Sequence, residues 1–232
     1  MEKHNYRVKY TRLRQLALIR HSEAEKTNRR VHGGLGTSLT PRGRLDTIDL
    51  ACYLKENTIV GDDTVIFTGP RPQTKETAEI LASELKIRLN ILDSLRNINM
   101  GLFDGLTDFE ATKCDPDSMA RLKAWRNGQL SVEEIQIPGA EDQKIFVKRI
   151  SSTLNDIVTL TTSPIVVVTR SVGIALHNLT STTFDGNFVK YIRLRLDPGS
   201  VTLYRKNASG KMETIHQNVT SYLKGFREFS DD

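Results

Sequence analysis

Short apolar runs alternate with amphipathic stretches along the chain, and this alternation is the clearest signal of its fold. Runs rich in β-branched residues predict buried or half-buried strands. They cover residues 16–20, 64–68, 88–92, 164–169, 191–196 and 200–204. Apolar residues at helical spacing predict helices between the strands. These cover residues 41–56, 75–86, 142–160 and 172–183. Strands that alternate with helices are typical of an α/β domain with a largely parallel sheet.

The chain is expected to form one domain with a short cap and a basic arm. Residues 1–14 are the arm and residues 15–232 the domain. Segment 107–137 contains helical stretches at 108–113 and 118–125, and we expect it to cap one edge of the sheet. Trp125 is interpreted as the anchor of this cap in the core rather than as a ligand contact. The last two strands predict an edge hairpin, followed by a polar tail.

The composition is that of an ordinary globular protein. Of the 232 residues, 38% are apolar and 26% are charged, which suits one large domain. No apolar run approaches the roughly 20 residues of a membrane helix, and the N-terminal region lacks an apolar signal segment, so we expect a cytoplasmic protein. Cys52 and Cys114 lie far apart without metal-ligand spacing and are interpreted as packing residues. We therefore expect neither a metal nor a cofactor.

The positive charge of the chain raises the question of nucleic acid. The formal net charge is +5, and basic residues crowd the first fourteen positions. These residues are Lys3, Arg7, Lys9, Arg12 and Arg14. We favour a solvated arm over a nucleic-acid contact, because the chain has no aromatic-rich strand for stacking bases and no helix-turn-helix or zinc signature. An interaction domain that contacts nucleic acid or an acidic partner through the arm stays open as a third class of function.

Two predicted strands end in cations. The first strand ends in Arg20, with His21 directly after it, and the strand at 164–169 is followed by Arg170. Because parallel strands present their carboxyl ends at one edge of a sheet, we expect these side chains to form a cationic pocket there. Guanidinium groups suit the oxygens of a phosphate or carboxylate. The alternative is that the Arg-His pair is a buried ion cluster that only supports the fold.

Six motifs follow in order over about residues 15–204. The first is Leu18-Ile19-Arg20-His21-Ser22-Glu23. The others are residues 31–43, Gly69-Pro70 with Glu76-Thr77-Ala78, Leu95-Arg96-Asn97 with residues 101–105, Pro138-Gly139-Ala140-Glu141, and Pro198-Gly199-Ser200-Val201-Thr202. Together they resemble the histidine phosphatase superfamily. That resemblance implies the phosphoglycerate mutase-like fold, a three-layer α/β/α sandwich with a mostly parallel central sheet. The short cap is similar to that of the phosphatase branch.

The resemblance also implies a mechanism. His21 would attack phosphorus and become a phosphohistidine, with Arg20 holding the equatorial oxygens. Three family positions are substituted, because the second histidine falls on Arg170, the arginine of the second motif on Gln73, and the general acid on Asn97. Ser22 also stands where a glycine is expected. Arg71 is positioned to supply the cation that Gln73 lacks.

The substitutions leave binding intact and put leaving-group protonation in doubt. An amide such as Asn97 cannot donate a proton to an alkoxide. The carboxyl groups considered as replacements are Glu141, Asp142, Glu23 and Glu25, with Glu141 preferred; its alternative role is at a helix N-terminus. His32 and His177 are further candidates near the site, although a surface or packing role is favoured for each.

The sequence therefore predicts a diverged histidine-phosphatase-like protein for a small phosphorylated or carboxylated metabolite. The predicted catalytic residues are His21, Arg20 and Glu141. The substrate-binding residues are Arg170, Arg71, Gln73, Asn97 and Ser22. If active, the protein is a phosphohydrolase or a diverged enzyme on an anionic small molecule. The alternative is a catalytically inactive ligand-binding or interaction domain.

Overall fold

A six-stranded sheet is the centre of the described structure. This computed structural model describes residues 15–25, 31–33, 35–127, 129–130, 134–160, 163–170, 196–207 and 212–223. The strands are β1 (Gln15–Arg20), β2 (Val65–Thr68), β3 (Arg88–Ile91), β4 (Ile165–Thr169), β5 (Val201–Lys206) and β6 (Met212–Val219). Their order is β3-β2-β4-β1-β5-β6. The first four in this order are parallel to one another, whereas β5 is antiparallel to both β1 and β6.

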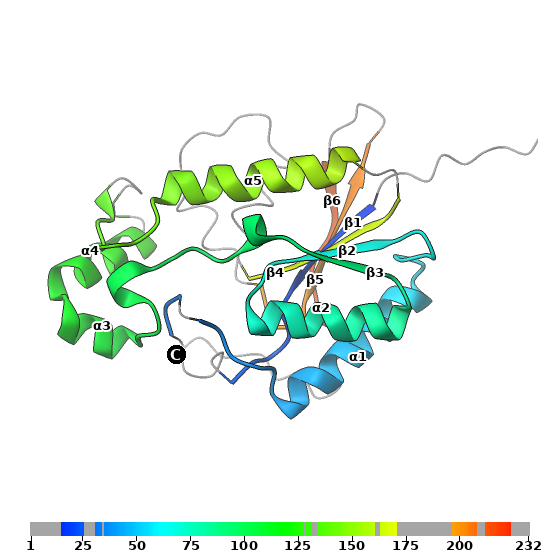
Figure 1. Ribbon diagram of the computed structural model, residues 1–232, viewed down its shortest axis with the longest axis horizontal. Coiled ribbons are helices and arrows are strands. Elements are labelled where there is room, and N and C mark those ends of the chain that lie inside the picture. Colours follow the sequence, from blue (N-terminus) through cyan, green and yellow to red (C-terminus); the bar gives the residue numbers. More distant parts are fainter. Residues whose placement is uncertain are drawn as a thin grey trace, which may run out of the picture.

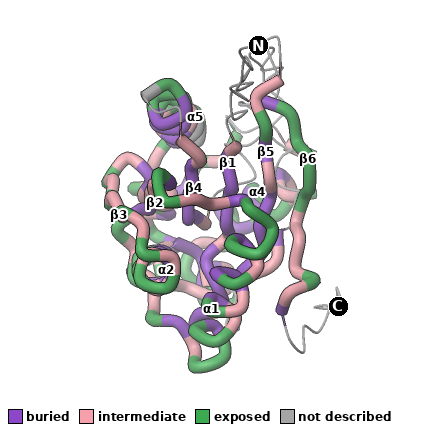
Figure 2. The backbone as a smooth tube through the Cα atoms, turned by 90° about the vertical axis from the view of Figure 1, so that its right-hand side faces the viewer, coloured by how far each residue is buried: buried purple, intermediate pink, exposed green. Residues whose placement is uncertain are grey.

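Helices cover both faces of this sheet. Helix α5 (Gln143–Leu160) lies on one face, and α1 (Pro41–Glu56) and α2 (Pro72–Leu85) lie on the other (Figure 1). Successive residues of β1 point to opposite faces of the sheet. Leu16 and Leu18 join the core under α5, whereas Ala17 and Ile19 join the core on the side of α1 and α2. In Figure 2 the buried strands β1 and β4 lie between the more exposed edges β3 and β6. The predicted three-layer α/β/α fold is confirmed.

Local signals at the helix starts agree with the sequence. Thr40 caps α1 through the Gly43 N–H, which donates to Thr40 Oγ1 at 2.9 Å, and Pro41 occupies the first helical position. The segment between β3 and α5 contains α3 (Asp108–Cys114) and α4 (Pro116–Arg126). Trp125 of α4 is buried in the core cluster under α5, as predicted for an anchor of the cap. The cap is thereby fixed to the domain.

Two predictions are wrong in the described residues. The chain after β5 is no polar tail, because β6 pairs with β5 and forms the edge hairpin. The strand was not predicted from the sequence because most of its side chains are exposed and polar. Cys52 and Cys114 are exposed free thiols rather than packing residues.

Three predicted segments lie outside the described residues, namely the basic arm at 1–14, the helix at 172–183 and the strand at 191–195. Within the described part of the chain, no helix has the length and apolar character needed to cross a bilayer.

Candidate functional site

The register of the parallel strands brings three chain segments to one edge of the sheet. Arg20 of β1 is paired with Thr169 of β4, so His21 and Arg170 follow at neighbouring positions. The backbone N–H of His21 donates to the Thr169 carbonyl at 3.3 Å. Thr68 at the end of β2 is paired with Val168, which brings Gly69 and the start of α2 to the same edge. Adjacent strands lie about 4.8 Å apart, so the Arg170 and His21 side chains start from neighbouring backbones.

The imidazole of His21 is held in one tautomer. The side chain is buried, with 3% of its surface exposed, and Nδ1 lies 2.8 Å from the backbone carbonyl oxygen of Ser22. A carbonyl oxygen only accepts hydrogen bonds, so Nδ1 carries the proton. In the neutral ring the lone pair therefore resides on Nε2. This is the arrangement that a nucleophilic imidazole needs.

Threonines from α1 and α2 hold the turn after His21. The Ser22 N–H donates to Thr77 Oγ1 at 3.2 Å. The Thr47 hydroxyl lies 2.7 Å from Ser22 Oγ and 2.7 Å from the carbonyl oxygen of Gly43. Ser22, Thr47 and Thr77 are all fully buried. A serine is therefore accommodated where the family has a glycine, because its hydroxyl has a buried polar partner.

Arg170 lies close enough to Arg20, and Arg71 close enough to Arg170, for one guanidinium to affect the pKa of the next. Burial and the proximity of Arg170 lower the pKa of Arg20 to about 10, with Asp197 acting in the opposite direction. Burial and the proximity of Arg71 lower the pKa of Arg170, and Asp104 opposes that shift. A guanidinium group carries a positive charge at neutral pH. Like charges gathered in a partly buried place favour the binding of an anion.

The carboxylates beside these cations are occupied by other donors. Asp104 Oδ1 accepts the Met100 N–H at 2.9 Å, and Asp197 Oδ2 accepts from the side-chain amide of Asn218 at 2.7 Å. The Arg20 guanidinium donates to the carbonyl of Leu196. These contacts hold the two carboxylates and the Arg20 side chain in place.

Gln73 lies in the first turn of α2 and is buried, with 3% exposed. Its Oε1 has no hydrogen-bond partner among the residues that the structure describes. The loop residue Gly36, at φ +92°, lets this amide approach closely, since a Cβ there would lie 2.3 Å from Oε1. A buried polar atom without a partner costs free energy. A ligand with a group that donates a hydrogen bond to Oε1 would remove this cost and bind more tightly.

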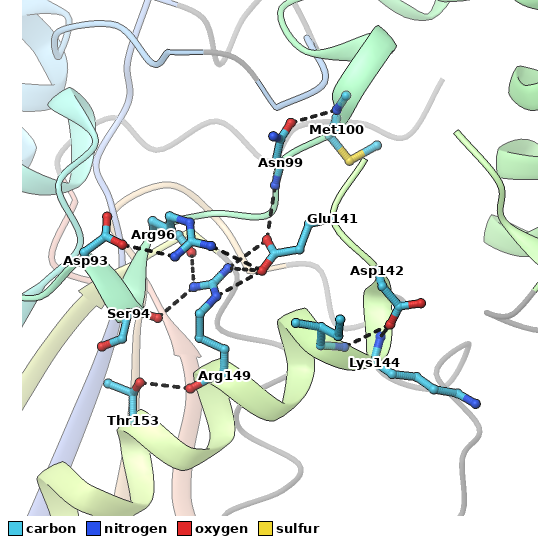
Figure 3. Close-up of polar contacts among 12 residues, drawn as sticks. Asp93, Ser94, Arg96, Asn99, Met100, Glu141, Asp142, Lys144, Arg149 and Thr153 are labelled. Atoms are coloured by element: carbon cyan, nitrogen blue, oxygen red, sulfur yellow. Dashed lines mark hydrogen bonds and ion pairs between the residues drawn. The ribbon is translucent and has the colours of Figure 1, made fainter. Parts of the chain in front are cut away.

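Asn97 follows a short 3₁₀ turn, η2 (Asp93–Leu95), on a segment that packs against the carboxyl end of β2. The contact is tight, because a Cβ on Gly69 would lie 2.5 Å from the Leu95 carbonyl oxygen. Arg149 of α5 donates from Nη1 to the carbonyl oxygens of Ser94 at 2.7 Å and Arg96 at 3.0 Å (Figure 3). The backbone that carries Asn97 is therefore held from both sides.

Glu141 takes part in this scaffold rather than in the cationic cluster. Its carboxylate accepts from Arg149 Nη2 at 2.9 and 2.8 Å and from Arg149 Nε at 3.0 Å, and Arg96 lies 3.5 Å away (Figure 3). Both carboxylate oxygens are thus occupied by guanidinium groups. This arrangement does not support the predicted role of Glu141 as a proton donor, because both of its oxygens face Arg149 and hold α5 to the segment before Asn97.

The other candidates for acid chemistry also have local roles. Asp142 Oδ1 accepts from the N–H groups of Lys144 and Ile145 and caps α5. Glu23 Oε1 accepts from the Thr40 hydroxyl at 2.7 Å. The backbone N–H of Glu25 donates to the Ser38 carbonyl at 3.2 Å. His177 lies outside the described residues.

His32 lies between the loop before α1 and the cap. Its Nε2 is 2.7 Å from Asp108 Oδ1, and its Nδ1 is 3.1 Å from Arg126 Nη2. Burial and the Arg126 charge lower the pKa of His32, with Asp108 opposing the shift. The carbonyls of its neighbours Val31 and Gly33 accept from the Arg170 guanidinium at 3.3 and 3.5 Å. His32 therefore joins the cap to the loop that contacts Arg170.

The chain belongs to the histidine phosphatase superfamily (branch 1), whose sequence profile matches residues 16–218. Among curated proteins, the bifunctional protein Rv2228c of Mycobacterium tuberculosis is 27% identical over 210 residues. That match covers 90% of this chain and 55% of the relative, so the chain spans about half the length of the curated relatives it matches.

Solved structures share the fold at low sequence identity. The Bacillus stearothermophilus protein YhfR has a TM-score of 0.74 at 21% identity, covering 90% of this chain and 99% of its own. The Entamoeba histolytica phosphoserine phosphatase, in complex with 3-phosphoglyceric acid, has a TM-score of 0.71 at 20% identity, covering 91% and 100%. The mycobacterial glucosyl-3-phosphoglycerate phosphatase Rv2419c, in complex with VO3, has a TM-score of 0.70 at 19% identity, covering 88% and 98%. These likenesses establish the phosphoglycerate mutase-like fold.

Sequence reasoning did not predict the supporting roles of three residues around the site. Thr47 and Thr77 support Ser22, and Arg149 supports the Asn97 segment. A polar residue on an otherwise apolar helix face was the available signal for the two threonines. Arg149 had no such signal, because its partner Glu141 lies eight residues earlier, before the helix begins.

Proposed function

We propose that this chain binds a small phosphorylated or carboxylated molecule at the carboxyl edge of its sheet. Arg20, Arg170 and Arg71 supply the positive charge, and His21 is the candidate nucleophile. Gln73, Asn97 and Ser22 complete the proposed pocket. Glu141 is assigned to the scaffold rather than to the reaction.

The observation that carries this proposal is the strand register together with the mutual effect of the arginines. The positions after β1 and β4 are neighbours, and Arg20 and Arg170 each lie near a second guanidinium that lowers their pKa. Such a group of cations gains free energy when an oxyanion enters. Two relatives that share the fold are described with phosphoryl or phosphate-like ligands, VO3 and 3-phosphoglyceric acid, which supports a phosphoryl group as the anion.

The proposed reaction starts at His21. Its Nε2 lone pair forms a bond to phosphorus, while the arginines stabilise the negative charge on the equatorial oxygens. Asn97 donates a hydrogen bond but no proton, so alkyl phosphomonoesters, whose alkoxide leaving groups need a proton, should be turned over slowly. This deficit favours a second candidate function, a binding protein without turnover.

Thermal melting with added orthophosphate tests the proposed pocket. Phosphate should raise the melting temperature of the natural protein in a saturable manner. The shift should be largely lost in Arg170→Ala, whereas Arg88→Ala, which removes an exposed charge at the amino end of β3, should keep it. An equal phosphate shift in natural protein and Arg170→Ala would contradict the proposal. Release of phosphate that disappears in His21→Ala would separate the enzyme from the binding protein.

A further inference from the structure

The position of Asn97 bears on which phosphoryl compounds the site can cleave. Arg149 fixes the carbonyls of Ser94 and Arg96, and Gly69 packs against the backbone between them. The amide of Asn97 is therefore presented by a rigid segment rather than by a loose loop. An amide can stabilise a leaving oxygen by a hydrogen bond but cannot protonate it.

The described carboxylates around the cationic cluster do not replace the missing acid. Glu141 is bound by two guanidinium groups, Asp104 lies near Arg170, and Asp197 lies near Arg20. Each of these carboxylates also accepts a hydrogen bond from a fixed donor of the protein: Glu141 from Arg149, Asp104 from the Met100 N–H, and Asp197 from the Asn218 amide. With no proton donor assigned among the described residues around the cluster, a leaving group would depart as an anion.

The positive charge of the arginine cluster favours a leaving group that departs as an anion. Arg170 lies near both Arg20 and Arg71, so three guanidinium groups gather beside His21. Such fixed cations can stabilise negative charge that develops on the leaving group as well as on the phosphoryl oxygens. A leaving group that is itself a carboxylate or a phosphate would benefit most.

We infer that the substrates of this site are phosphoryl compounds with an acidic leaving group, namely acyl phosphates or phosphoanhydrides. The inference rests on the proposed function, since it requires His21 as the nucleophile. Carboxylic acids have a pKa of about 4 and phosphate monoanions of about 6. Phenols lie near 10 and water near 16. Only the first two groups leave readily as anions near neutral pH.

The steps balance without an acid. His21 Nε2 donates its electron pair to phosphorus, and the P–O bond breaks with its pair going to the leaving group, which departs as a carboxylate or phosphate anion. Nδ1 keeps its proton, so the phosphohistidine is an imidazolium with a phosphoryl group. Water then bonds to phosphorus, the P–N pair returns to Nε2, and both protons of that water leave with dihydrogen phosphate.

A series of leaving groups tests this inference in the whole protein. We would measure kcat/KM for acetyl phosphate, 4-nitrophenyl phosphate, phenyl phosphate and glycerol phosphate. Acetyl phosphate should exceed glycerol phosphate by more than about 10³-fold, because a general acid typically contributes about 10²–10⁴-fold. Asn97→Asp, assayed at about pH 5.5 where part of the carboxyl is protonated, should raise phenyl phosphate turnover and flatten the series.

Asn99→Asp is the matched control, since its Oδ1 accepts the Gly101 N–H and an aspartate keeps that bond. It should leave the series unchanged. Glycerol phosphate turnover within tenfold of acetyl phosphate would overturn the inference, as would equal effects of the two aspartate variants. Absence of His21-dependent acetyl phosphate turnover, in a protein that orthophosphate still stabilises, overturns the inference alone. Loss of orthophosphate binding itself would instead contradict the proposed function.

Discussion

Replacement of Arg149 by methionine should destabilise the protein strongly. Arg149 makes five hydrogen bonds, three to Glu141 and two to the carbonyls of Ser94 and Arg96. The side chains of Arg149 and Glu141 are 15% and 10% exposed, so water can replace only part of these contacts. Methionine keeps the apolar stem and removes all five bonds.

The expected cost follows from the charge that is left behind. Removal of one partner of a buried ion pair typically costs about 3–5 kcal/mol. Arg96 stays 3.5 Å from Glu141 and the pair is not fully buried, so we expect the lower end, about 3 kcal/mol. For a domain of this size that corresponds to a fall in melting temperature on the order of 10 °C. Glu141→Gln should cost less, because the amide oxygen still accepts a hydrogen bond from Arg149 and the guanidinium keeps the carbonyl oxygens of Ser94 and Arg96 as acceptors.

A double-mutant cycle measured by urea unfolding checks this reasoning. The coupling free energy between Arg149→Met and Glu141→Gln should be about 1–3 kcal/mol. Arg121→Met, which removes an exposed arginine of α4, is the control and should change the free energy of unfolding by less than about 0.5 kcal/mol. A cost for Arg149→Met no greater than for Arg121→Met, or a coupling free energy near zero, would refute the assigned role.

Two further predictions concern the surroundings of the site. Thr47→Val removes a fully buried hydroxyl from Ser22 and should lower the free energy of unfolding by about 1–3 kcal/mol, which denaturant titration can measure; an unchanged midpoint would argue against this contact. Burial and Arg126 lower the pKa of His32 below the unfolded value of 6.5, so the unfolded chain binds this proton more readily and stability should fall as pH drops below 6.5. His32→Gln should reduce that fall in unfolding experiments between pH 7.5 and 5.5, and parallel pH profiles of the two proteins would contradict the assignment.

Much of the fold followed from apolar periodicity, and the exceptions have physical reasons. β4 is buried at every position, and its β-branched run made it easy to predict. β6 exposes most of its side chains, so the alternation that identifies a half-buried strand is missing. Cys52 follows Leu50 and Ala51 in α1 but points to the solvent side of that helix. An apolar residue type on an exposed face cannot be distinguished from a core residue by composition alone.

The site was predictable as far as strand ends determine it. Arg20, His21 and Arg170 were expected at one edge because parallel strands end together, and the register puts His21 and Arg170 at neighbouring positions. The role of Glu141 was beyond such reasoning. Its partners Arg149 and Arg96 come from different elements, and only the packing of α5 against the 3₁₀ turn η2 brings them together.

A crystal of the natural protein soaked with vanadate tests the central claim most directly. The account predicts vanadium bonded to Nε2 of His21, with vanadate oxygens within hydrogen-bond distance of the guanidinium groups of Arg20 and Arg170. Bonding through Nδ1 would contradict it, because that atom carries the proton toward the Ser22 carbonyl. Vanadate bound elsewhere, with Arg170 directed to bulk water, would contradict the shared pocket itself.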